Sequence, residues 1–185
     1  MYGMINKAVG EMVCRNFGEE AWEDIKAKAG CDIDVFISND AYPDELTYRL
    51  VGAAAEKLGV SADAVLTEFG KHWILETARR GYAELMFASG RTLPEFLDNL
   101  PNFHTRVTMI FPNLEPPRFE CTNVTATSLN LHYHSSRRGL TAFVFGLLDG
   151  LGEMFGTEVD VQLAESRAEG ADHDVFLVRW AAPAT

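Results

Sequence analysis

Residues 128–137 read Ser-Leu-Asn-Leu-His-Tyr-His-Ser-Ser-Arg, and the hydrophobic pattern of the chain changes at this stretch. Its apolar side chains, Leu129, Leu131 and Tyr133, alternate with polar ones, which is the period of a β-strand with one buried face. Upstream of the stretch, apolar residues recur at helical spacing instead. Three more strands are expected, at Arg118–Val124, Val159–Leu163 and Val175–Trp180.

Helical spacing dominates the chain before the first strand. The expected helices are residues 1–17, Glu19–Ala29, Pro43–Leu58, Ser61–Gly81 and Thr92–Phe111, and one more helix, Gly139–Phe155, lies between the strands. Pro101 should kink or split the helix that contains it, because proline removes a backbone donor and clashes with the preceding turn. Helices followed by strand, strand, helix, strand, strand predict an α+β fold.

The same order predicts the organisation of the chain. We expect a single domain over residues 1–180, with a helical N-terminal lobe over about 1–112 and a C-terminal lobe over about 113–180. The C-terminal lobe should hold a four-stranded antiparallel sheet and a packed helix. Residues 181–185 are expected to form a loose tail.

Composition excludes several classes of protein. Hydrophobic residues make up 47% of the 185 residues, which is enough for a sizeable core and too many for a disordered chain. With 16 Lys and Arg against 27 Asp and Glu, the net charge of -11 disfavours nucleic acid and anionic membrane surfaces as partners. The N-terminus lacks a signal-peptide pattern, no apolar run could span a bilayer, and the 3 cysteines are widely spaced. These features predict a cytoplasmic protein.

His104 lies on the apolar side of its expected helix, between Leu100 and Val107. One interpretation is a core histidine whose nitrogens find local partners, because buried polar groups are usually satisfied. The other is an axial ligand, because a neutral imidazole on a rigid helix facing an apolar cavity is what ferrous heme requires on its proximal side. The pattern around His104 leaves both interpretations open.

Tyr133, Ser135 and Arg137 are spaced by two at the end of the expected strand, so their side chains should form a row roughly 13 Å long on one side. A phenol, a hydroxyl and a guanidinium can all donate hydrogen bonds to an anion, and the guanidinium fork matches a carboxylate. The alternative is a solvated strand end whose arginine pairs with one of the many acidic residues.

Together these two features resemble the heme nitric oxide/oxygen-binding (H-NOX) family, which includes the sensor domain of soluble guanylate cyclase. The resemblance is carried by Tyr133, Ser135 and Arg137 as a Y-x-S-x-R motif, His104 as the proximal histidine, and the P-P-x-F segment Pro116-Pro117-Arg118-Phe119. It extends over nearly the whole chain and implies heme b buried between the two lobes. The motif residues would hold its propionates, and Pro117 would press on the porphyrin.

The resemblance also implies the rest of the site. Leu100 and Val107 would pack beside His104, and Pro101 departs from the family pattern. The expected distal residues are Met1, Ile5, Val9, Trp73, Phe143 and Leu147. Oxygen-binding members carry a distal tyrosine where this chain has Ala142 or Phe143, neither of which donates a hydrogen bond. Trp73 is the exception among the expected distal residues: its indole N–H could donate, or the ring could simply fill the pocket. We therefore expect ferrous heme that binds nitric oxide and carbon monoxide but forms no stable oxygen complex.

No catalytic apparatus beyond the cofactor is visible in the sequence, so the chain is not expected to be an enzyme. Such a sensor must signal to a separate protein. For stand-alone bacterial members the resemblance implies that this partner is a histidine kinase or a cyclic-dinucleotide enzyme.

The competing interpretation is an enzyme or carrier that binds another small molecule in the same pocket, or a metal at His132 and His134. An H-x-H pair with His173 or Asp172 nearby is a weak zinc signal, and a polar outward face is the simpler interpretation. Some similar bacterial chains carry a C-terminal cysteine cluster that binds zinc. This chain has no cysteine after Cys121, so we expect no zinc. The glycine-rich stretch Gly146-x-x-x-Gly150 predicts close helix packing rather than a phosphate loop.

Overall fold

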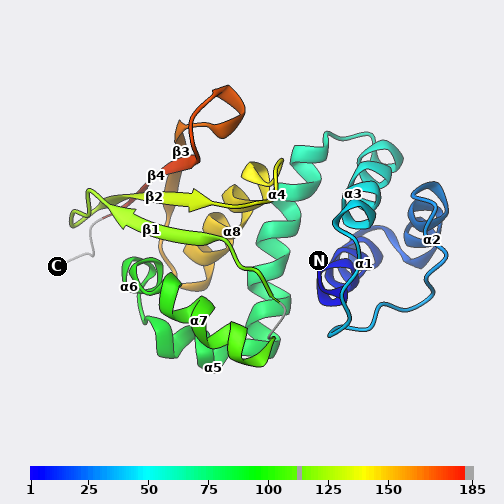
Figure 1. The fold of residues 1–185 in the computed structure, drawn as a ribbon, viewed down its shortest axis with the longest axis horizontal. Coiled ribbons are helices and arrows are strands. Elements are labelled where there is room, and N and C mark those ends of the chain that lie inside the picture. The colour runs from blue at the N-terminus through cyan, green and yellow to red at the C-terminus, as the bar shows by residue number, and fades with distance from the viewer. Residues whose placement is uncertain (112–113, 182–185) are drawn as a thin grey trace.

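The computed structural model describes residues 1–111 and 114–181, and it combines helices with a sheet formed by the C-terminal part of the chain (Figure 1). The helices that precede the sheet are α1 (Gly3–Phe17), α2 (Glu19–Lys28), α3 (Asp44–Leu58), α4 (Ala62–His72), the π-helical turn η1 (Trp73–Ala78), α5 (Arg79–Ser89), α6 (Leu93–Asp98) and α7 (Leu100–Ile110). The predicted α+β class is confirmed. The lobe boundary expected at residues 112–113 and residues 182–185 of the expected tail lie outside the described residues.

Local signals in the sequence set several helix ends. The Oγ atom of Ser61 accepts a hydrogen bond from the backbone N–H of Ala64 at 3.1 Å, which satisfies a free donor in the first turn of α4. Gly59 ends α3 in the left-handed conformation at φ 69°, where a Cβ atom would be strained. Pro101 lies in the first turn of α7, so the expected long helix is split into α6 and α7 at Asn99. That position tolerates proline because its N–H would be unpaired in any case.

The sheet is antiparallel throughout, with strand order β1-β2-β4-β3. Its strands are β1 (Arg118–Thr122), β2 (Ser128–His134), β3 (Val159–Glu165) and β4 (Asp174–Trp180). Leu129, Leu131 and Tyr133 are buried, while the residues between them are half-buried, as the alternation predicted. Helix α8 (Thr141–Met154) connects β2 to β3 and packs its buried side chains, among them Val144 and Leu148, with the buried face of the sheet.

Two clusters of buried apolar residues form the core. One joins α1, α2, α3 and α4 around side chains such as Val13 and Leu50. The other extends from Ile74 through α5, α6 and the start of α7 to the sheet and α8. The helices after Trp73 therefore share a core with the sheet, although their sequence position placed them in the expected N-terminal lobe.

Helices α4 and α8 pack backbone to backbone through glycines. A Cβ atom at Gly70 or at Gly146 would lie less than 3.0 Å from backbone atoms of the facing helix, and one at Gly150 would meet Lys71 and Ile74. Only glycine permits this close approach. The prediction that Gly146-x-x-x-Gly150 serves helix packing is confirmed. None of the described helices combines the length and apolar character needed to cross a lipid bilayer.

Candidate functional site

A cavity of about 310 Å³ lies between the helices and the part of the sheet that contains Phe119 and Tyr133. Residues of α1, α3, α4, α7 and α8 and of strands β1 and β2 form its walls, so both buried clusters contribute to it. Most of its lining is apolar. The predicted site residues that line it are Met1, Ile5, Trp73, His104, Val107, Pro117, Tyr133, Ser135, Arg137, Phe143 and Leu147. Segments that are far apart in the sequence thus bring most of the predicted residues to one cavity.

His104 is held by aromatic neighbours on the wall formed by α7. Its ring stacks on Phe119 of β1, with centroids 5.6 Å apart and planes at 26°, and it contacts Phe103 at 5.7 Å. The Nδ1 atom is buried and has no hydrogen-bond partner among the described residues. Burial lowers the pKa of His104 to about 4, so the imidazole is neutral at pH 7. A neutral imidazole with an unpaired nitrogen is suited to bind a metal.

The motif residues Tyr133, Ser135 and Arg137 all line the cavity, although β2 ends at His134. Ser135 and Arg137 belong to the bend that follows, where the Ser135 hydroxyl accepts a hydrogen bond from the backbone N–H of Arg137 at 3.1 Å. Burial raises the pKa of the Tyr133 phenol, which therefore stays protonated and able to donate. The three side chains offer a phenol, a hydroxyl and a guanidinium to an anionic group in the cavity.

Protein groups alone hold the guanidinium of Arg137 in place. Its Nε donates to the Asp44 carboxylate at 2.7 Å, and its Nη1 donates to the carbonyl of Glu115 at 3.2 Å. Its Nη2 has no hydrogen-bond partner among the described residues. Because guanidinium has five N–H donors, some remain available for a carboxylate. The predicted anion-binding arginine is thus positioned by an acidic residue that the sequence pattern did not single out.

Two predicted site residues do not line the cavity. Val9 is completely buried among the helices of the first core cluster, one turn further along α1 than Ile5. Leu100 is buried in the second cluster, one turn before His104 on α7. Both share the apolar stripe of their helix with residues that do reach the cavity. Helical spacing identifies a stripe but does not tell which part of it faces a cavity.

Several tyrosines line the cavity that the sequence pattern did not identify: Tyr2, Tyr48 and Tyr82. The hydroxyl of Tyr48 donates to the carbonyl of Arg138 at 3.1 Å. Tyr82 has non-helical backbone angles inside α5 and packs against Phe111, with centroids 6.2 Å apart. Gly81, at which the sequence predicted the helix to end, was the available signal for this kink. Tyr82 and Trp73 are hydrogen-bond donors on a mostly apolar wall.

The residues present fit an amphipathic cofactor that carries iron and carboxylates. The imidazole of His104, whose buried Nδ1 has no partner among the described residues, could bind the iron, and the apolar wall could enclose a flat hydrophobic ring. Tyr133, Ser135 and Arg137 can bind carboxylates that such a ring carries. This donor set matches heme and gives no support to a phosphate-bearing cofactor, since the described lining has no glycine-rich phosphate loop.

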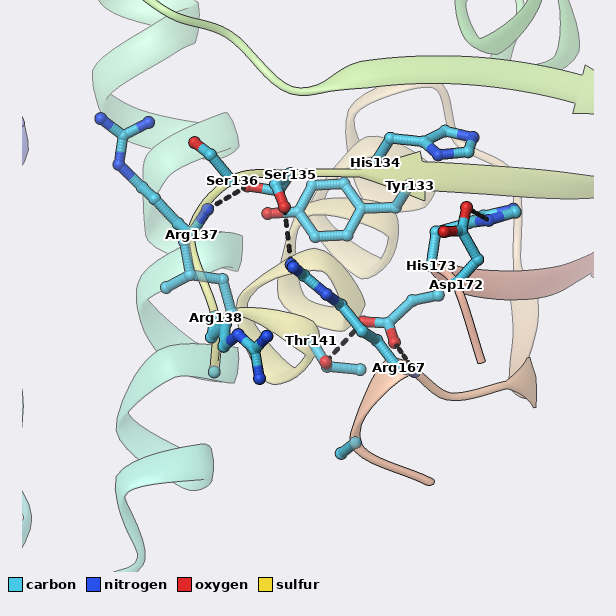
Figure 2. Close-up of a pocket in the computed structure, with 14 residues that line it drawn as sticks. Tyr133, His134, Ser135, Ser136, Arg137, Arg138, Thr141, Arg167, Asp172 and His173 are labelled. Atoms are coloured by element: carbon cyan, nitrogen blue, oxygen red, sulfur yellow. Dashed lines mark hydrogen bonds and ion pairs between the residues drawn. The ribbon is translucent and has the colours of Figure 1, made fainter. Parts of the chain in front are cut away.

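A second, more polar cavity of about 490 Å³ lies beside the end of β2 (Figure 2). It shares Tyr133, Ser135, Arg137 and Leu140 with the first cavity. The competing site was predicted at His132 and His134, completed by His173 or Asp172. Of these residues, His134, Asp172 and His173 line the second cavity but not the first, and His132 lines neither. Thus the structure separates the competing site from the cavity that contains His104.

Comparison with known proteins agrees with this geometry. A model of the haem-NO-binding family matches residues 2–163. The soluble guanylate cyclase gcy-31 of Caenorhabditis elegans is 30% identical over 96% of this chain, and the cyclase 89Db of Drosophila melanogaster is 24% identical over 90%. The chain spans 25% of the length of each of these relatives.

Solved structures show the same fold. The H-NOX protein of S. oneidensis in the Fe(II)NO state has a TM-score of 0.88 at 20% identity, with 98% of this chain and 99% of that chain covered. The unliganded Fe(II) H-NOX protein of K. algicida has a TM-score of 0.87 at 24% identity, with 100% and 99% covered. Because the family model matches most of this chain, the chain belongs to the haem-NO-binding family.

Proposed function

We propose that this chain binds heme b in the cavity of about 310 Å³, with His104 as the axial ligand, and senses nitric oxide. The observation that carries the proposal is the position of His104. Its imidazole, with a buried and unpaired Nδ1, lines an otherwise largely apolar cavity that also holds the three polar motif residues. Membership of a heme-based gas-sensor family supports the same assignment.

The residues around the cavity would have distinct roles. Tyr133 and Ser135 would donate hydrogen bonds to the heme propionates, and Arg137 would add a charge-assisted one. Asp44 would hold Arg137 in place, because its carboxylate already accepts from Nε at 2.7 Å. Val107 and Pro117 would pack against the ring on the side of His104.

The cavity lining would decide which gas is retained. When bound, the heme supplies an iron coordination site for a diatomic gas. The expected distal side chains that reach the cavity, namely Met1, Ile5, Trp73, Phe143 and Leu147, are mostly apolar and exclude water. Trp73 and Tyr82 are the exceptions, because each carries a hydrogen-bond donor on the cavity wall. This lining favours nitric oxide and carbon monoxide, which need no donor, over a stable oxygen complex.

The chain would act by signalling rather than by catalysis. It corresponds to a quarter of the guanylate cyclases it matches, so their cyclase activity is not carried over to it. We propose a separate cytoplasmic partner, such as a histidine kinase or a cyclic-dinucleotide enzyme, whose activity depends on the gas. The check is to measure the partner's turnover with this protein present, with and without nitric oxide.

The visible spectrum tests the central claim. The protein reconstituted with heme should show an intense absorption band near the violet edge, with a histidine-ligated ferrous spectrum. His104→Gly should lose tight heme binding and regain a ligated spectrum when free imidazole is added. Thr105→Gly is the matched control, because it introduces the same helix-destabilising residue at an exposed neighbouring position of α7. Normal heme retention by His104→Gly would refute the assignment, and a protein that binds no heme would favour the carrier or metal-enzyme alternative.

A further inference from the structure

Two histidines and an aspartate gather beside the end of β2, outside the cavity proposed for heme. His134, Asp172 and His173 each place one potential metal-binding atom within 4.8 Å of the others. The rings of His134 and His173 stack with centroids 3.8 Å apart. Figure 2 shows His134 on β2 next to His173 and Asp172, which approach from the bend that precedes β4.

The strand register explains why these residues meet. Tyr133 of β2 pairs with Asp174 of β4 in the antiparallel ladder, so His134 and His173, one residue further along each strand, lie side by side. Alternation along β2 directs Tyr133 to the buried face and His134 to the opposite face. The cluster therefore lies on the outer face of the sheet, adjacent to Ser135 and Arg137 in sequence but turned away from His104.

A hydrogen-bonded chain leads into the cluster from the neighbouring strand. The Thr122 hydroxyl lies 2.7 Å from Nε2 of His132, and Nδ1 of His132 lies 2.8 Å from Nε2 of His173. On the other side of its ring, Nδ1 of His173 lies 3.2 Å from the Asp172 carboxylate. His132 and Thr122 thus fix the orientation of the His173 ring.

The proton positions along this chain have two consistent arrangements. If Thr122 donates to His132, then His132 donates to His173, and Nδ1–H of His173 donates to Asp172. If each donor is reversed, Nε2–H of His173 donates to Nδ1 of His132, and the single lone pair of His173 Nδ1 faces the Asp172 carboxylate, which is also an acceptor. Two acceptors at 3.2 Å repel each other unless a cation lies between them. The second arrangement is the one found behind metal-bound histidines, whose free N–H is held by an outer partner.

We propose that His134, His173 and Asp172 form a binding site for a divalent transition metal of the zinc class. Two imidazole nitrogens and one carboxylate oxygen match the ligands that Zn²⁺ prefers. The ligand atoms of a tetrahedral Zn²⁺ lie about 3.4 Å apart. The three candidate atoms lie within 4.8 Å of one another, so side-chain rotations that move each atom by roughly an ångström would bring them to that distance. Water would complete the coordination, because Asp172 is 91% exposed.

The surroundings of the cluster are compatible with a bound cation. Arg118 is the cross-strand neighbour of His134, but its guanidinium pairs with Glu120 at 3.0 Å. The site does not depend on cysteine, whose absence from the C-terminal part of the sequence led to the expectation of no zinc. That expectation already counted His173 or Asp172 as possible partners of the H-x-H pair; the fold brings both of them to His134, while His132 contacts His173 from behind.

Zinc titration of the purified full chain by calorimetry tests the site. We expect saturable binding of about one Zn²⁺ per chain, weakened at least tenfold by His134→Gln and by His173→Gln, which each remove a ligand. His132→Gln should weaken binding less, because His132 positions His173 without touching the metal. Glu169→Gln is the matched control: it removes an exposed acid from the turn before the cluster and should leave zinc affinity unchanged.

A second readout identifies the ligands independently. The imidazole nitrogen chemical shifts of His134 and His173 should move on zinc addition, while those of His72 stay fixed. Absence of saturable binding, or equal affinity in wild type and the His134→Gln/His173→Gln double variant, would overturn the proposal. The heme proposal is tested separately, since these variants leave His104 and Arg137 in place and their heme spectra should equal that of wild type.

Discussion

The carboxylate of Asp44 accepts a hydrogen bond from Nε of Arg137 at 2.7 Å, although the two residues are 93 positions apart. The other oxygen of Asp44 accepts from the N-terminal ammonium group at 2.5 Å. Asp44 begins α3, and Arg137 follows β2. One carboxylate therefore connects the start of the chain, a helix of the first core cluster and the segment proposed to hold the heme propionates.

We expect Asp44→Asn to lower the thermal stability at pH 7. Burial alone would raise the pKa of Asp44, but hydrogen bonds from the N-terminal ammonium and Arg137 lower it below its ordinary value. A carboxyl group whose pKa is lower in the folded state stabilises the fold above its unfolded pKa, and this contribution is lost as the pH falls through the folded pKa. The loss in Tm should be roughly 2–4 °C, the shift for about 1 kcal/mol.

The pH dependence makes this prediction specific. The difference between wild type and Asp44→Asn should shrink as the pH falls below about 4, where the wild-type carboxyl group is progressively protonated. Glu45→Gln removes the same charge from the same helical turn but breaks no ion pair among the described residues. Thermal melts of the three proteins across this pH range are the measurement. An effect of Glu45→Gln as large as that of Asp44→Asn would show that helix-end charge, not the pairing with Arg137, is responsible.

Arg137→Ala should weaken heme retention more than Arg138→Ala. Arg137 lines the proposed heme cavity, whereas Arg138 lines only the neighbouring polar one, and Figure 2 shows their side chains pointing in different directions. A charge-assisted hydrogen bond contributes about 1.5–3 kcal/mol, so retention should fall by roughly one to two powers of ten. The rate of heme transfer to an excess acceptor protein measures this. Equal rates in the two variants would contradict the propionate assignment.

The reduced, heme-loaded protein should bind nitric oxide and carbon monoxide but form no stable oxygen complex in air. The reason is the mostly apolar lining, which offers few donors to the partial negative charge of bound oxygen. Spectra recorded after mixing with aerated buffer check this. A persistent oxygen spectrum would contradict the prediction, and its loss in Trp73→Phe or in Tyr82→Phe would identify the donor.

Gly146→Ala should destabilise the protein, whereas Gly52→Ala should not. Both glycines lie inside helices, but a Cβ atom at Gly146 would collide with the backbone of Thr67, while one at Gly52 meets nothing within 4 Å. Overpacking typically costs about 1–3 kcal/mol, and alanine at an open helical site gains up to about 1 kcal/mol. Denaturant unfolding of both variants gives the comparison. Equal stability would mean that α4 and α8 can separate without cost.

Sequence reasoning predicted the elements of this fold because their signals are local. Ser61 caps α4, Pro101 splits the helix that contains it, and the alternation around Leu131 fixes the buried face of β2. Several ends differ from the prediction: β1 ends at Thr122 rather than Val124, and α8 begins at Thr141 rather than Gly139. The prediction that the helix ends at Gly81 was wrong, because the chain only kinks at Tyr82 and continues as α5 to Ser89. Such differences arise because ends depend on neighbours as well as on the local sequence.

The relations between distant segments were not predictable in the same way. The partners of Arg137 and the position of Tyr82 in the cavity depend on how helices pack, and no periodicity encodes that. The same is true of the second core cluster, which includes both Leu97 and Phe176 although helix and strand were expected in different lobes. His134 and His173 meet only through the register of β2 with β4, which the sequence leaves open.

The π-helical turn over Trp73–Ala78 changes the phase of the helical path between α4 and α5. Residues five apart on an α-helix point in directions about 140° apart, but a π turn brings them close to alignment. Trp73 and Ala78 accordingly both line the cavity. If the same residues continued as an α-helix instead, everything after them would be rotated by roughly 100°. Met86, which is 1% exposed, would then turn out of its core, so the length of this turn sets the orientation of α5.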